Sequence, residues 1–99
     1  MQSKAEIVRS WLSASFGGTT VSHRYVDMLH KFRVETTPLR WLYVSDEFLD
    51  DQSEADLLVA LRDFEVFERL IAKPASTHLL LTHTSLVEVD GEFGRSASA

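Results

Sequence analysis

The densest group of chemically capable side chains is an acidic run between residues 46 and 56. It contains Asp46, Glu47, Asp50, Asp51, Glu54 and Asp56. Clustered carboxylates provide the oxygen ligands that magnesium and calcium prefer, which makes Asp46 and Asp50 candidate metal ligands. The spacing does not match an EF-hand loop. Acids also gather where a helix begins, because they favour the positive end of the helix dipole, so a purely structural role stays open.

Histidine is the other residue type suited to proton transfer near neutral pH. His83 ends an apolar segment and is a candidate general base beside Asp46 or Glu47, provided the two segments are neighbours. If residues 21–34 form a helix, His23 and His30 share one face, but about 10 Å separates positions i and i+7, which is too far for one metal ion. The chain has no cysteine and no G-x-S-x-G motif, so the common nucleophile signatures are absent.

Three segments resemble parts of ABC-type and SMC-type ATPases. The apolar segment LYVSDE at residues 42–47 resembles their Walker B strand, and Leu49-Asp50 stands where those families carry a D-loop. The segment LLLTH at residues 79–83 is similar to the strand that ends in their switch histidine. Upstream, residues 15–18 are loosely similar to the signature loop.

This resemblance implies roles for three side chains. Asp46 would help to hold magnesium, Glu47 would polarise the attacking water, and His83 would sense the terminal phosphate. No G-x-x-x-x-G-K-[ST] motif occurs, so nothing in the chain is expected to cradle the phosphates. The resemblance therefore implies a degenerate lobe that cannot hydrolyse ATP alone.

The first structural element is a helix predicted over residues 3–16. Ser3 and Glu6 form a capping box, and Gly17-Gly18 provides the left-handed stop. Apolar residues recur between them at helical spacing: Ile7, Val8, Trp11, Leu12 and Phe16.

Residues 21–34 fit two structures. As a helix they separate an apolar face from a charged face, whereas as a strand the alternation is less clean. We favour the helix, and Pro38 ends the segment in either case.

The remaining pattern predicts an α+β fold. Residues 39–45 form an apolar strand covered on both faces, residues 52–72 a long helix, residues 77–83 a second strand, and residues 86–89 a possible third. A strand, a helix and a strand in succession make a right-handed crossover with parallel strands. We therefore expect one small domain over residues 1–90. It would have an N-terminal helix or helix pair, this crossover unit and a small mixed sheet, followed by a flexible tail at residues 91–99.

Composition limits the function. The 99 residues carry a formal net charge of −5, which argues against a nucleic-acid partner. No apolar run reaches the roughly 20 residues needed to cross a membrane, and the N-terminus does not resemble a signal peptide, so we expect a cytoplasmic protein. Nothing in the sequence calls for a cofactor.

The sequence favours a non-enzymatic interaction or regulatory domain, acting as a homodimer or within a complex. Trp41 and Tyr43, with nearby Arg40, are candidate partner-binding residues, because aromatic and cationic side chains together make a stacking platform. Aromatic side chains on a strand that is apolar on both faces also fit a core, so that role stays open. Residues 20–40 are basic and residues 41–72 strongly acidic, which suits pairing of opposite patches between two chains or docking of a basic protein. The alternative is a ligand-binding or catalytic site at Asp46, Glu47 and His83.

Overall fold

The computed structural model describes residues 3–89, so the predicted tail at 91–99 lies outside the described residues. In chain order the elements are α1 (Lys4–Ser15), β1 (Val21–Val26), β2 (Leu29–Val34), β3 (Arg40–Ser45), α2 (Asp46–Asp51), α3 (Glu54–Asp63), α4 (Val66–Leu70), β4 (Thr77–Leu81) and β5 (Leu86–Glu88). The predicted α+β class is confirmed, as is the N-terminal helix that Ser3 caps through the amide of Glu6.

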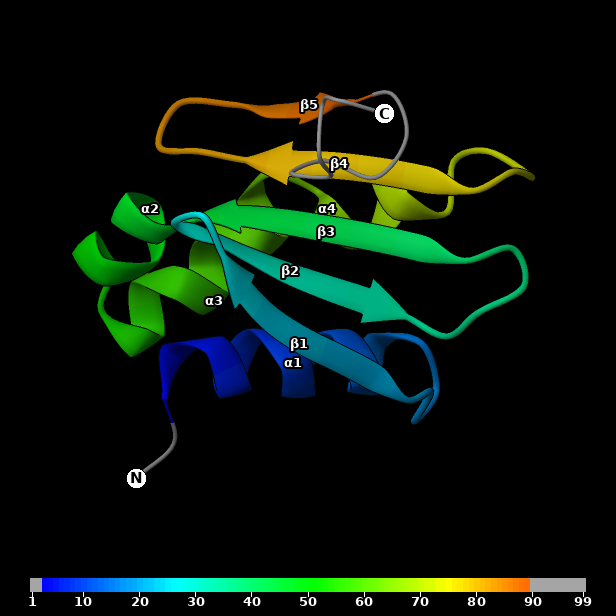
Figure 1. The fold of residues 1–99 in the computed structure, drawn as a ribbon, viewed down its shortest axis with the longest axis horizontal. Coiled ribbons are helices and arrows are strands. Elements are labelled where there is room, and N and C mark those ends of the chain that lie inside the picture. The colour runs from blue at the N-terminus through cyan, green and yellow to red at the C-terminus, as the bar shows by residue number, and fades with distance from the viewer. Residues whose placement is uncertain (1–2, 90–99) are drawn as a thin grey trace.

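The five strands form one mixed sheet in the order β1-β2-β3-β4-β5 (Figure 1). The pairing of β3 with β4 is parallel, and the other three pairings are antiparallel. Helices α2, α3 and α4 connect the two parallel strands, which confirms the predicted crossover unit. The sheet is larger than the sequence indicated, because residues 21–34 contribute two further strands.

The helix favoured for residues 21–34 is wrong, since this segment is a β-hairpin. Asp27 and Met28 both have left-handed backbones, with φ of 54° and 63°, and they form a two-residue turn between Val26 and Leu29. Turns of this kind match the twist of paired strands. The hairpin buries Phe32 and Val34 against the helices, whereas the helical spacing would have buried Tyr25 and Met28, both exposed here.

The long helix predicted for residues 52–72 is two helices instead. Glu65 has φ of 56°, a left-handed backbone that ends α3 and lets α4 begin in a new direction. Between β3 and α3, where the sequence pattern predicts neither a helix nor a strand, lies the short helix α2. Ser45 caps it by accepting a hydrogen bond from the amide of Phe48.

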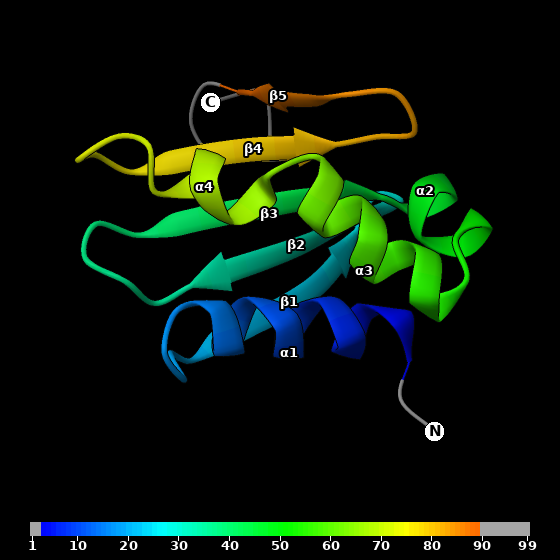
Figure 2. The same cartoon turned by 180° about the vertical axis from the view of Figure 1, so that it is seen from behind.

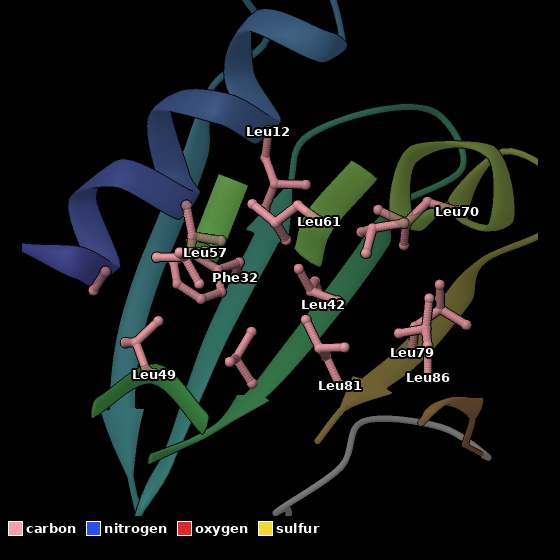
Figure 3. Packing of buried hydrophobic residues seen from close by; sticks show 14 of the residues in the cluster. Leu12, Phe32, Leu42, Leu49, Leu57, Leu61, Leu70, Leu79, Leu81 and Leu86 are labelled. Carbon is pink, nitrogen blue, oxygen red and sulfur yellow. The ribbon is translucent and has the colours of Figure 1, made fainter. Parts of the chain in front are cut away.

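The core lies on one side of the sheet. Helices α1, α3 and α4 cover this side, as the view from behind shows (Figure 2). Phe32 and Leu42 from the sheet meet Leu12 and Leu61 from the helices, and all four are fully buried (Figure 3). Within residues 3–89 no helix covers the opposite side, which faces the viewer in Figure 1 and is called the open face below. The described residues contain no helix with the length and apolarity required to span a membrane.

Replacing the cap of α3 tests why this helix begins where it does. The Ser53 hydroxyl accepts a hydrogen bond from the amide of Asp56 at 3.1 Å. Ser53→Ala leaves that amide without its partner and is expected to lower the free energy of unfolding by about 1 kcal/mol. Ser76→Ala, in an exposed loop, is the control and should change it by less than about 0.5 kcal/mol. Equal values in urea unfolding would contradict the capping role.

Candidate functional site

The structure does not bring Asp46, Glu47 and His83 together. Because β3 and β4 are parallel, their carboxyl ends do lie at the same edge of the sheet, as predicted. His83, just beyond β4, turns to Asp51 instead, with 2.8 Å between its Nε2 and Oδ2 of that carboxylate. Asp46 points to His30, and Glu47 is exposed in the first turn of α2. The proposed acid–base group is therefore divided between separate contacts.

A different group of side chains lies at this edge of the sheet, the histidine array formed by His23, His30 and Asp46. His30 Nε2 lies 3.2 Å from Asp46 Oδ1, and His30 Nδ1 lies 3.0 Å from His23 Nε2. Since an ionised carboxylate only accepts, the neutral array has one consistent arrangement: His23 donates to His30, which donates to Asp46. The two rings are stacked with centroids 5.2 Å apart, and Phe32 supports His23 from the sheet.

Sequence reasoning missed this array because it depends on the hairpin. With the turn at residues 27–28, His23 lies opposite Phe32 and Tyr25 opposite His30, so the two histidines become diagonal neighbours on one face. A helix would have placed them two turns apart. The signal that could have found the pair is the strand alternation from Val26 to Val34, which also fits this segment.

The metal-binding prediction gains no support from these contacts. Within residues 3–89, no three side chains of the histidine, cysteine, aspartate and glutamate types are placed to hold one ion. The contact made by Asp50 is structural, because its backbone carbonyl accepts a hydrogen bond from Lys4 Nζ at 2.8 Å. Acids in the first turns of α2 and α3 also have a local explanation in the helix dipoles.

The histidine array predicts a pH dependence of stability. Burial, followed by the charge of His30, lowers the pKa of His23 from its ordinary value. Below pH about 6.5 the unfolded chain therefore binds a proton that the folded chain resists, so the free energy of unfolding falls as the pH is lowered.

His23→Gln tests this linkage, because its amide still donates to His30 but does not titrate. Between pH 7.5 and 5.5 this variant should lose less stability than the unchanged chain, by at most about 1 kcal/mol given the partial exposure of the ring. His83→Gln, at an exposed pair, is the control. Parallel pH profiles for the unchanged chain and His23→Gln would refute the assignment.

The open face carries a concentration of positive charge on β1 and β2. Arg24 and Lys31 are directly opposite each other in the antiparallel register, and neither makes an ion pair within residues 3–89. Like charges at opposed positions destabilise a sheet. We refer to Arg24 and Lys31 as the cation pair. In the described part of the chain, no contact with an acidic side chain offsets the repulsion between these two charges.

An aromatic side chain borders the cation pair. The Arg33 guanidinium lies 5.6 Å from the centre of the Trp41 ring, and Arg33 is also paired with Glu35 at 2.7 Å. A hollow of about 330 Å³ lies over this part of the open face. Its walls combine charge with apolar surface, and they are formed by Ser22, Arg24, Val26, Lys31, Arg33 and Trp41.

The three predicted partner-binding residues have different positions. Trp41 is half-buried on the open face beside the cation pair. Tyr43 is on the same face but fully buried, with its hydroxyl 3.0 Å from Nδ1 of His78. Arg40 lies on the helix side, where its Nε donates to the carbonyl of Leu70 at 3.0 Å. Sequence reasoning did not single out Arg24, Lys31 and Arg33 as site residues, because only the hairpin brings them beside Trp41.

Comparison of the chain with models of known families, with curated proteins and with solved structures found no match.

Proposed function

We propose that this chain is a protein-interaction domain, not an enzyme, and that its open face binds an acidic segment of another protein. The observation that carries the proposal is the cation pair: two opposed positive charges that have no counter-ion within residues 3–89. A carboxylate placed between Arg24 and Lys31 relieves their repulsion and gains a charge-assisted hydrogen bond from each.

The shape and chemistry of the hollow favour a mixed acidic and apolar segment. The rim offers Trp41 as an anchor, and aromatic side chains of this kind contribute strongly to protein interfaces. Val26 is exposed at one end of the hollow, and Val87 is exposed on β5 of the same face. An extended peptide with alternating acidic and apolar residues matches this arrangement, since its side chains alternate between opposite sides.

The distribution of charged residues favours an acidic partner over a basic one. The acidic residues at the start of α2 and α3 are each accounted for by a helix N-terminus, whereas the cation pair has no such local reason. The net charge of −5 also opposes binding to nucleic acid, because the acidic residues between positions 41 and 72 repel the phosphate backbone. The alternative site at Asp46, Glu47 and His83 would need these groups to converge, and their contacts are separate.

Calorimetric titration with two short peptides tests the proposal. The first alternates glutamate and valine around one phenylalanine, and the second replaces each glutamate by glutamine. We expect measurable binding of the glutamate peptide, at least about tenfold weaker binding of the glutamine peptide, and loss of affinity between about 50 mM and about 500 mM sodium chloride. Equal affinities for the two peptides, or tighter binding of an oligothymidylate of the same charge, would overturn it.

A further inference from the structure

Within residues 3–89, no strand pairs with the outer edge of β1. Because the two-residue turn makes Val26 and Leu29 a hydrogen-bonded pair, the N–H and C=O groups of residues 22, 24 and 26 point to β2. Those of Val21, His23 and Tyr25 therefore point outward. No backbone hydrogen bond to these outward groups occurs within residues 3–89.

Two of the features that usually prevent strand addition are missing from this edge. Its pairing with β2 is continuous over six positions without a bulge, and the strand contains no proline. The opposite edge of the sheet, β5, is only three residues long. Three apolar side chains are exposed where β1 ends, with fractional exposures of 52% for Tyr25, 38% for Val26 and 64% for Met28. An exposed edge of this kind is a template for another strand.

We propose that β1 pairs antiparallel with β1 of a second copy, so that two sheets become one. The register that uses all the outward groups places His23 opposite His23 of the partner subunit, and Val21 opposite Tyr25 of the partner subunit. In this register Arg24 faces Ser22 of the partner subunit, so no two arginines are directly opposed. A shift by two residues places Arg24 opposite Arg24 of the partner subunit, which like-charge repulsion disfavours. The register centred on His23 therefore uses all three outward-facing residues and opposes no two arginines directly.

This pairing has a consequence for the open face. Because the cation pair lies on β1 and β2, joining two copies at β1 places the two positive hollows side by side on one continuous face. Their mutual repulsion weakens the dimer, and either salt or an acidic ligand relieves it. This coupling rests on the function proposed above, whereas the strand pairing itself does not.

Salt dependence separates this dimer from the pairing of opposite patches. A contact between the basic open face and the acidic residues of a second copy loses attraction as salt screens it. Where such contacts are head-to-tail, they form rings or open chains. The β1 dimer gains affinity with salt and stops at two copies. Sedimentation equilibrium of the full chain at about 50 mM and about 500 mM sodium chloride measures both properties.

Two variants at one position link the dimer to the edge of β1. Tyr25→Pro removes an outward N–H and is expected to be monomeric up to about 1 mM, a concentration at which a weak dimer with a Kd near 100 µM is mostly formed. Tyr25→Ala keeps the N–H and should still dimerise, with an affinity reduced about tenfold or less. Circular dichroism checks that both variants are folded. Amide hydrogen exchange at His23 and Tyr25 in the unchanged chain should slow as the protein concentration rises.

These measurements distinguish results that support the inference from results that overturn it. The inference is supported if salt strengthens the dimer, if Tyr25→Pro abolishes it, and if dimerisation slows exchange at the amides of His23 and Tyr25. Any of four results overturns the inference: the chain stays monomeric, salt weakens the association, Tyr25→Pro leaves the dimer unaffected, or protection of the amides needs an added peptide. If the dimer forms but the glutamate peptide does not bind, the proposed function fails while the strand pairing stands.

Discussion

Lys31→Glu is expected to abolish binding of the glutamate peptide while making the domain more stable. In the folded chain this change places a carboxylate opposite Arg24, so a repulsive cross-strand pair becomes an attractive one. Opposite charges at such positions contribute about 0.2–1 kcal/mol, and the free energy of unfolding should rise by that amount. The new carboxylate also occupies Arg24, so both charge contacts to a ligand are lost together.

The expected loss of affinity is at least about a hundredfold. Two hydrogen bonds to charged groups, each contributing about 1.5–3 kcal/mol, account for a change of that size. Arg69→Glu is the matched control, because it changes the net charge equally on α4, away from the open face. Urea unfolding of both variants measures the change in stability, and calorimetric titration measures the change in peptide affinity. Loss of stability in Lys31→Glu, or equal loss of binding in both variants, would contradict a functional role for the cation pair.

The second large effect concerns the core. Phe32→Ala removes a fully buried ring from the side of the sheet that meets α1 and α3. The cost is expected to be about 3–5 kcal/mol, a large share of the 5–15 kcal/mol typical of domains. In a domain of this size, the melting temperature should fall by more than about 12 °C.

Trp41→Ala provides the contrast, because it removes a larger ring from the open face. Trp41 is half-buried and stacks on His78, with ring centres 5.6 Å apart. We expect it to cost about 1–2 kcal/mol and to weaken peptide binding. Thermal melts of both variants, with peptide titration of Trp41→Ala, make the comparison. If Trp41→Ala destabilises the chain as much as Phe32→Ala, the tryptophan belongs to a core and not to a docking surface.

Elements with their own local signals could be predicted from the sequence. The helix α1 has a cap, a glycine stop and an apolar stripe, and the strands β3 and β4 are short apolar segments on either side of helical sequence. Their parallel pairing follows from the crossover rule. The break at Glu65 could not be predicted, because a left-handed backbone at glutamate has no sequence signature.

The site depends on register, which the sequence left ambiguous. Residues 21–34 satisfy a helical pattern, and the turn at Asp27 and Met28 lacks the glycine or asparagine that usually marks a hairpin. Without that turn, neither the pairing of Arg24 with Lys31 nor the contact of His23 with His30 can be inferred. The sequence did indicate Trp41 and the charge asymmetry, but it did not reveal which cations share the open face.

The most direct test of the central claim is where an acidic peptide binds. Nuclear magnetic resonance of the labelled full chain, titrated with the glutamate peptide, reports each backbone amide and the Trp41 indole separately. We expect the largest shifts along residues 22–33 and at the Trp41 indole, and we expect no such shifts with the glutamine peptide. Shifts confined to α2 and α3, or the same shifts with both peptides, would contradict it.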